Sequence, residues 1–498
     1  MDAYDELLEI LKDIDLMGQL RSLLGWDQEV MMPPKAAALR GEQIAWISRE
    51  SHKKKTSSRI GELLDELDGI DGLTDIEIAN IRLARDAYEK ATKLPTEFVS
   101  EMARHNSKAL ISWTEAREKN DFSIFRDDLA KCIDFARKKA DYLGYENLRY
   151  DALLDIYESG LTVARLDPLF DGLRNEVAPL IRSVTQRGES LDMSWITDNK
   201  WSRQGQERLS QRVSEAMGFD FDAGRRDAST HPFCGGPNPD DVRWTTRYSD
   251  DDPFGSLYGS MHETGHGTYE QGRPRSLDFQ PAGYANGLGI HESQSRLWEN
   301  QIGRSYEFCK WALPLWKEEF PENTDGIDAE KLWKSVNVIE PSLIRVEADE
   351  ATYNIHIMIR YEIEKLLISG ELEVDDLPDK WDDMYEEYLG IRAEDRASGV
   401  LQDIHWSMGA IGYFPTYTLG NLYSAQLLEA AREDLPDHDS QISRGEFQPL
   451  LNWMREKVHS RGSILQPAEL IEEACGSPPS PEAFVEYLKR KVARLYGI

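Results

Sequence analysis

"SMHETGHGTYEQGRP", residues 260–274, places two histidines four positions apart, with a glutamate directly after the first. On a helix, positions i and i+4 lie one turn apart on the same face. His262 and His266 can therefore each direct a ring nitrogen to one Zn²⁺ ion at ~2.0–2.1 Å. Glu263 is rotated by about 100° around such a helix, so it can reach a water on the ion and not the ion itself. The H-E-x-x-H pattern has this meaning only if the segment is helical.

The residues that flank this stretch support a helix. Asp250–Asp252 offer side chains for the N-cap, Pro253 fits the first turn, and Gly272 followed by Pro274 fits the end. Glycines inside a helix are costly, and they make sense where other backbone or a substrate approaches closely. The segment contains three of them: Gly259, Gly265 and Gly267.

A catalytic zinc takes three protein ligands and keeps one position open. Tyr269 and Gly272 stand where the metzincin continuation requires glycine and histidine, so the third ligand must come from elsewhere. The next helical segment, "GIHESQSRLWENQIG" (289–303), offers Glu292 near its start. Glu299, two turns on, is the rival carboxylate, although an exposed helix charge is its simpler interpretation. His291 could bind instead, but neighbours on a helix point about 100° apart, so His291 and Glu292 do not both bind.

Helix signals dominate the rest of the chain. Long amphipathic segments fill 1–230 and 300–498, and in 74–95 Thr74 and Glu77 have capping-box spacing before Pro95 marks the end. A C-terminal helix opens with Ser480 and Pro481. Only "DDVRWTTRY" (240–248) alternates as a strand does. We therefore predict a mainly α protein with a small β-sheet beside the H-E-x-x-H segment.

Composition limits the class of protein. The 498 residues are 40% hydrophobic and 30% charged, a globular balance. The formal net charge of −32 repels nucleic acid. No stretch approaches the ~20 apolar residues of a membrane span, and the acidic start lacks the pattern of a signal peptide. We expect a cytoplasmic protein with neither nucleic-acid nor membrane partners. The scattered cysteines predict no disulfide framework: Cys132, Cys234, Cys309 and Cys475.

A set of motifs in fixed order resembles the carboxypeptidase Taq family, the M32 metallocarboxypeptidases, from one end of the chain to the other. These motifs are "WDQEVMMPPKAAALRGEQ" (26–43), "HPF" (231–233), "DVRWT" (241–245), "HETGH" (262–266), "HESQS" (291–295), "IRVEAD" (344–349), "GVLQDIHW" (399–406), "GYFPTYTLGN" (412–421) and "LYGI" (495–498). Trp26 and Asp27 open the first motif, and we expect them to pack an N-terminal helix.

The resemblance implies a large helical peptidase body with a long substrate groove, and commonly a homodimer. It implies release of single residues from peptide C-termini with broad preference, and zinc that cobalt can replace. The implied ligands are His262, His266 and Glu292, with Glu263 as the catalytic carboxylate. We expect one catalytic unit over 1–498, in which 1–230 forms one groove wall, 231–425 holds the metal and substrate site, and 426–498 adds helices.

An exopeptidase must also recognise a free carboxylate, for which the arginine fork is suited. From the residues alone, Arg345 could either do this or pair with Asp349, and Arg243 is the second candidate; the resemblance favours Arg345. Oxyanion donors and other substrate contacts are expected among His231, His405, Tyr413 and Tyr417. Residues expected to support the site from behind are Asp349, Asp241 and Asp403.

Two other functions fit the same motif. A helical oligoendopeptidase would share the zinc centre but would not need a carboxylate clamp. A non-catalytic scaffold would keep zinc for structure, although an intact Glu263 argues against it. An aminopeptidase is disfavoured because the chain has no G-x-M-E-N segment to anchor a free amine.

Overall fold

The computed structural model describes residues 2–187 and 192–498, and these form two compact units. Of these residues, unit 1 takes 2–92, 192–336 and 424–478, and unit 2 takes 93–187, 337–423 and 479–498. The fold is mainly α with one small sheet, as predicted. The long groove and the division at 230 and 425 stay predictions.

Unit 1 holds the sheet and the H-E-x-x-H segment. Its helices are α1 (Ala3–Val30), α2 (Ala37–Lys55), α3 (Ser58–Glu66), α4 (Asp75–Lys93, whose last residue lies past the boundary), α9 (Ser194–Thr197), α10 (Arg203–Ala216), α11 (Pro253–Gly272), α12 (Leu288–Arg296), the π-helical turn η4 (Leu297–Ile302), α13 (Tyr306–Glu319), α14 (Ala329–Ser335), α18 (His438–Ser443), α19 (Gln448–Lys457) and α20 (Pro467–Cys475).

Unit 2 is helical. Its helices are α5 (Thr96–Lys119), α6 (Ser123–Leu143), α7 (Asp151–Leu154), α8 (Val163–Thr185), α15 (Glu350–Ser369), α16 (Leu377–Leu389) and α21 (Glu482–Tyr496). Helix α17 (Pro415–Asp434) begins in unit 2 and ends in unit 1. Within 2–187 and 192–498, none of the helices combines the length and apolar content that a bilayer span requires.

Local chemistry at the helix ends follows the sequence. The Asp252 carboxylate accepts hydrogen bonds from the backbone N–H groups of Phe254 and Gly255, and Pro253 is the first residue of α11. The predicted capping box of α4 also forms, since Glu77 accepts from the Thr74 backbone at 2.7 Å. Helix α21 begins at Glu482, one residue later than predicted, with the Ser480 hydroxyl accepting from its first N–H.

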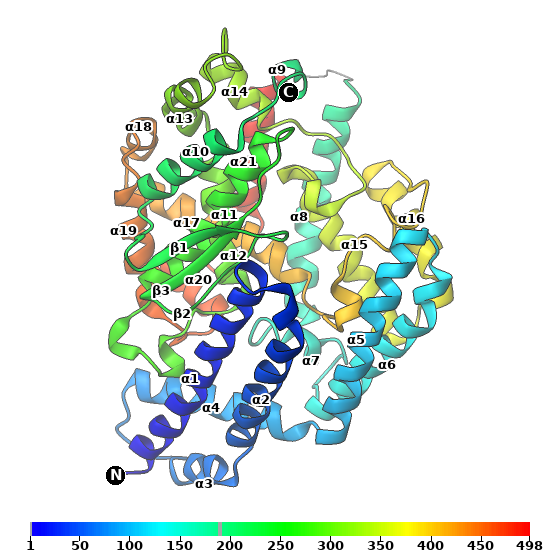
Figure 1. Ribbon diagram of the computed structural model, residues 1–498, viewed down its shortest axis with the longest axis vertical. Helices are drawn as coiled ribbons and strands as arrows, with labels where there is room; N and C mark the ends of the chain where they lie inside the picture. Colours follow the sequence, from blue (N-terminus) through cyan, green and yellow to red (C-terminus); the bar gives the residue numbers. More distant parts are fainter. Residues whose placement is uncertain (1, 188–191) are drawn as a thin grey trace. The chain divides into compact units, whose positions relative to one another are not determined.

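The sheet has three strands, β1 (Gly224–Ala228), β2 (Cys234–Asn238) and β3 (Asp241–Thr246), in the order β1-β3-β2. β1 runs parallel to β3, and β2 runs antiparallel to it. Val242 and Trp244 are buried, as the alternation predicts. Thr245, on the other face of the strand, is buried as well, and a hydrogen bond with the Ser229 hydroxyl satisfies its own hydroxyl. β3 packs against α11, so the sheet lies directly beside the H-E-x-x-H helix (Figure 1).

The glycines of α11 record how closely its neighbours approach. A Cβ on Gly265 would lie 2.6 Å from the backbone oxygen of Gln294 on α12, and a Cβ on Gly267 would lie 2.7 Å from the Phe219 ring. At Gly259 the nearest atom would be 4.0 Å away. The expectation of close neighbours is therefore confirmed at two positions, and packing does not explain the third.

Candidate metal centre

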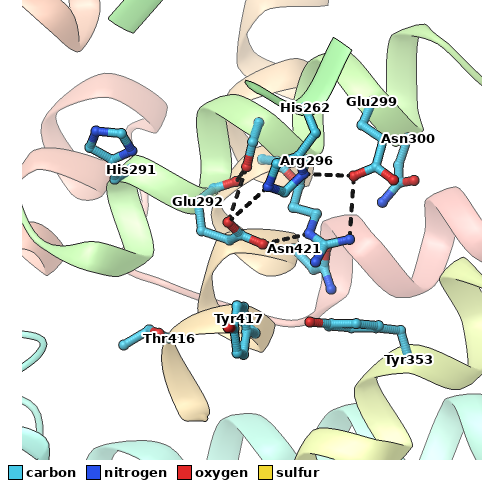
Figure 2. A network of polar contacts seen from close by, with 12 residues as sticks. His262, His291, Glu292, Arg296, Glu299, Asn300, Tyr353, Thr416, Tyr417 and Asn421 are labelled. Carbon is cyan, nitrogen blue, oxygen red and sulfur yellow. Dashed lines mark hydrogen bonds and ion pairs between the residues drawn. The ribbon is translucent and has the colours of Figure 1, made fainter. Parts of the chain in front are cut away.

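Three side chains from two adjoining helices direct their donor atoms to one point. His262 and His266 come from α11. Glu292 comes from α12, and Figure 2 shows its carboxylate facing the His262 ring. Their nearest donor atoms all lie within 4.8 Å of one another. The three side chains are largely buried, with exposed fractions of 19%, 14% and 9%.

The spacing of these donors fits a tetrahedral metal site. The two Nε2 atoms lie 3.2 Å apart, and Glu292 Oε2 lies 3.6 Å from His262 Nε2 and 3.5 Å from His266 Nε2. Ligands at ~2.0–2.2 Å around a tetrahedral ion are separated by about 3.3–3.6 Å. Two imidazoles and one carboxylate are also a donor set that zinc accepts. The residues therefore fit a divalent cation, with a position left for a fourth ligand.

The ring nitrogen of His262 that faces away from this point is held by a carboxylate. Its Nδ1 lies 2.8 Å from Glu299 Oε2. The exposed role considered for Glu299 is therefore wrong, since only 15% of its side chain is exposed. Such a carboxylate fixes the ring orientation and the tautomer of a ligating histidine.

The outer nitrogen of His266 has a different partner. His266 Nδ1 lies 2.6 Å from His291 Nδ1, and His291 Nε2 lies 2.9 Å from Glu270 Oε1. His291 and Glu292 are adjacent on α12, and they point to opposite sides of His266: Glu292 to its inner nitrogen and His291 to its outer one.

Arg296 connects the two carboxylates of this helix (Figure 2). Its Nε donates to Glu292 Oε1 at 2.6 Å, and its Nη1 donates to Glu299 Oε2 at 3.4 Å. The contact with Oε1 leaves Oε2 of Glu292 facing the histidines. The π-helical turn η4, which carries Glu299, follows directly after Arg296, and such turns are frequent at functional sites.

The electrostatics of the cluster attract positive charge. Burial opposes protonation of His262, but the carboxylates of Glu292 and Glu299 raise its pKa to about 9. Burial and the neighbouring His291 lower the pKa of His266 to about 4. Burial raises the pKa of Glu263 to about 7, because few polar groups solvate its charge.

The other predicted residues of unit 1 form a separate cluster around the sheet. Arg243 donates twice to Asp241, at 2.7 and 2.9 Å, and its guanidinium lies 4.3 Å from the centre of the Trp26 ring. Trp26 thus joins α1 to the sheet, as the packing role predicted. Asp241 supports Arg243 in these contacts, and not a histidine. His231 lies on an exposed loop before β2. The substrate roles of Arg243 and His231 stay predictions.

Unit 2 brings together the predicted residues of the two motifs at 344–349 and 399–406. Arg345 donates from Nε and Nη2 to Asp403 Oδ1, at 3.0 and 2.7 Å, and from Nη1 to the Tyr353 hydroxyl. Asp403 Oδ2 accepts from Arg360 at 2.6 Å. Two guanidinium groups therefore share one carboxylate in a buried cluster. The pKa of Asp403 lies well below its usual range because these cations outweigh burial.

Aromatic donors surround this pair of arginines. His405 Nε2 lies 3.3 Å from the Tyr417 hydroxyl, and the His405 and Tyr413 rings are 5.5 Å apart. Burial lowers the pKa of His405 to about 4, so its ring is neutral at pH 7. The pair considered between Arg345 and Asp349 does not form, since Arg345 pairs with Asp403. The Asp349 carboxylate instead caps α15 by accepting from the N–H groups of Ala351 and Thr352.

Sequence reasoning missed three residues. Arg296 and Glu270 contact the metal centre or its supporting side chains, and Arg360 contacts Asp403. Part of the signal was in the spacing. Positions 292, 296 and 299 recur at i+4 and i+7, as do 262, 266 and 270 at i+4 and i+8, so each set shares one helix face.

A helical body with a small sheet, and a His-His-Glu cluster on two adjoining helices, is typical of helical metallopeptidases. The model of the family described as carboxypeptidase Taq (M32) metallopeptidase matches residues 6–492. The chain is 41% identical to thermostable carboxypeptidase 1 of Thermus thermophilus and 40% identical to carboxypeptidase 1 of Bacillus subtilis, covering 99% of this chain in both cases and 99% and 98% of those proteins.

Solved structures agree. The M32 carboxypeptidase of Deinococcus radiodurans superposes with a TM-score of 0.97 at 36% identity, over 100% of both chains. A carboxypeptidase of Pyrococcus furiosus superposes with a TM-score of 0.96 at 38% identity, over 99% of both chains. The chain therefore belongs to the carboxypeptidase Taq (M32) family, which confirms the resemblance seen in the sequence. It is a metallocarboxypeptidase, an enzyme that requires a metal ion and acts on peptides.

Proposed function

We propose that this enzyme is zinc-dependent, and that His262, His266 and Glu292 are the zinc ligands. The observation that carries the proposal is the spacing of their donor atoms, 3.2 to 3.6 Å, which matches the edges of a tetrahedral site. Cobalt, which accepts the same ligands and geometry, should replace zinc.

A zinc ion held there would supply a water activated at neutral pH and a Lewis acid for the scissile carbonyl. Glu263 is proposed as the general base that takes a proton from water and passes it to the departing amine nitrogen. Its position supports this role, because it follows His262 on α11 and is 6% exposed. A carboxylate in such a place has few competing contacts with bulk water.

Recognition of the free C-terminus is proposed for the Arg345 cluster. Arg345 and Arg360 carry two positive charges and share the single negative charge of Asp403, so one positive charge remains to attract a carboxylate. His405 and Tyr417 add neutral hydrogen-bonding groups beside it, and Tyr413 packs on the His405 ring. Selection by the terminal carboxylate, which all peptides share, agrees with a broad preference for the released residue.

The test uses an N-blocked dipeptide and its C-terminal amide, each with and without a chelator. We expect release from the free acid only, lost with the chelator and restored by zinc or cobalt. Cleavage of the amide at a similar rate would contradict the exopeptidase proposal and favour an oligoendopeptidase. Activity that survives complete removal of the metal would contradict the zinc centre.

Replacement of Glu263 separates catalysis from metal binding. Glu263→Gln keeps the shape of the side chain but removes the base, so we expect at least a 10²-fold loss of kcat with zinc content unchanged. A variant that loses zinc and activity together would show that Glu263 holds the site and does not act as the base.

Three further properties stay proposals: a homodimer and the breadth of substrate preference, which the family resemblance implies, and a cytoplasmic location, which the sequence itself predicts. Sedimentation of the purified protein tests the first, and a panel of dipeptides that differ in the last residue tests the second.

A further inference from the structure

The two candidate histidine ligands are supported in different ways. His262 Nδ1 meets a carboxylate, Glu299, directly at 2.8 Å. His266 Nδ1 instead meets a second imidazole, that of His291, at 2.6 Å, and the carboxylate of Glu270 lies beyond it at 2.9 Å. A ligating imidazole almost always donates its second N–H to an acceptor, so the question is whether His291 can serve as one.

The proton positions in the hydrogen-bonded series His266–His291–Glu270 follow from the proposed role of His266 as a metal ligand. A neutral imidazole carries one N–H. If His266 binds metal through Nε2, its proton is on Nδ1, and that N–H must donate to His291 Nδ1. His291 then carries its own proton on Nε2, which faces Glu270. Each donor meets an acceptor in this direction, whereas the reverse direction would place the His266 proton on Nε2, inside the cluster.

Glu270 is suited to be the last acceptor in this series of hydrogen bonds. It stands one turn after His266 on α11, and Arg273 lies 3.2 Å from its other oxygen. Burial would raise the pKa of Glu270, but the hydrogen bond from His291 and the charge of Arg273 lower it to about 2. Glu270 is therefore an acceptor only. A cavity of about 300 Å³ lies between α1, β2 and the start of α12, and its lining includes Glu270, Arg273 and His291. Small molecules such as water can therefore reach the Glu270 end of this series of hydrogen bonds.

We propose that His291 and Glu270 are positioning residues, which hold His266 in the tautomer and orientation that metal binding requires through an imidazole-to-carboxylate relay. This inference rests on the proposed role of His266 as a ligand. It explains why a histidine stands directly before Glu292: the side chains of adjacent helix positions diverge, so His291 and Glu292 reach the two different nitrogens of the same ring.

The experiment measures Zn²⁺ affinity of the metal-free protein by competition with a chelating dye. His291→Phe keeps a ring but removes both nitrogens, and we expect affinity to fall about 10- to 100-fold. His291→Asn keeps an acceptor near the position of Nδ1, so we expect it to recover most of that loss. Glu270→Gln keeps a neutral acceptor for His291, and we expect a loss of about 3- to 10-fold, below the usual range of such effects.

Two controls separate the possible failures. His266→Ala removes the proposed ligand itself; if it binds Zn²⁺ as tightly as the wild type, the proposed centre is wrong. If His266→Ala loses Zn²⁺ while His291→Phe and Glu270→Gln keep wild-type affinity, the centre stands and the relay is overturned. His438→Asn changes another buried histidine in a different helix, α18, and should leave Zn²⁺ affinity at the wild-type value. If His291→Phe does not fold, Glu270→Gln decides alone: unchanged affinity overturns the relay.

A spectroscopic readout distinguishes positioning from general support of the fold. Co²⁺ in the site reports the orientation of its ligands by visible absorption. His291→Phe should shift the Co²⁺ bands relative to the wild type, and His291→Asn should shift them less. Identical spectra for all three proteins would contradict a role of His291 in orienting His266.

Discussion

Arg296 supplies positive charge to two buried carboxylates. Its guanidinium donates to Glu292 at 2.6 Å and to Glu299 at 3.4 Å. Removing one partner of a buried ion pair leaves an uncompensated charge and typically costs ~3–5 kcal/mol. A divalent cation beside Glu292 would supply positive charge at the same place. The arginine and the metal therefore both neutralise this pair of glutamates, and the stability lost without Arg296 should depend on the metal.

We predict that Arg296→Met lowers the free energy of unfolding by about 3–5 kcal/mol in metal-free protein, and by clearly less in protein saturated with zinc. Urea unfolding of both forms measures the difference. Arg296→Lys is the matched variant: it keeps the charge but loses the planar fork, so its loss should be intermediate. Equal losses with and without zinc would show that Arg296 has no link to the metal centre.

At this scale the sequence predicted the members of the site better than their contacts. The i, i+4 spacing was enough to select His262 and His266, whereas it left Glu292 and Glu299 as rivals. Seven helix positions are almost two full turns, so both carboxylates lie on one face and periodicity cannot separate them. The difference arises where α12 crosses α11, which brings Glu292 to the inner nitrogens and Glu299 to the outer nitrogen of His262.

Helix α11 shows which features of an element are local. Asp252 caps its start, Pro253 is its first residue and Gly272 is its last, and all three could be predicted. The partners of β3 could not. β1 reads Gly-Arg-Arg-Asp-Ala and β2 reads Cys-Gly-Gly-Pro-Asn, and neither has the alternation of a half-buried strand. Both strands form because they pair with β3, and pairing between distant segments leaves no period in the sequence.

The crossing of α11 and α12 depends on one glycine. We predict that Gly265→Ala destabilises the protein by about 1–3 kcal/mol and weakens zinc binding, because its Cβ would lie 2.6 Å from a backbone oxygen of α12 and would move Glu292 away. Calorimetry and chelator competition measure the two effects.

Gly259→Ala, on the same helix, is the control. Its Cβ would have no neighbour closer than 4.0 Å, so the higher helix propensity of alanine should leave stability unchanged or raise it by up to about 1 kcal/mol. A loss in Gly259→Ala as large as that in Gly265→Ala would mean that the close approach to α12 does not set the cost.

The stability of the whole molecule as a function of pH should contain a contribution from one buried acid that lies outside the candidate metal centre. Glu364 on α15 is fully buried and accepts hydrogen bonds from the Tyr150 hydroxyl, the Trp406 indole and the backbone of Gly412. These contacts hold the chain segment around Trp406 and Gly412 to the helix. Burial nevertheless raises the pKa of Glu364 to about 7, from an ordinary value of 4.5. Between these two values the folded state binds a proton that the unfolded state releases, so this contribution is complete below pH 4.5, decreases as pH rises, and is lost above pH 7.

We predict that Glu364→Gln removes this dependence, because the amide is neutral at every pH, even if the variant is less stable throughout. The loss of unfolding free energy between pH 5 and pH 8 should be smaller in the variant than in the wild type by an amount on the order of 3 kcal/mol. Urea unfolding at both pH values gives this double difference, in which the titration of all other groups cancels. Glu371→Gln, at an exposed position just after the same helix, reports the effect of losing one surface carboxylate. Parallel pH profiles for the wild type and Glu364→Gln would mean that Glu364 stays ionised when folded, and that its three donors outweigh its burial.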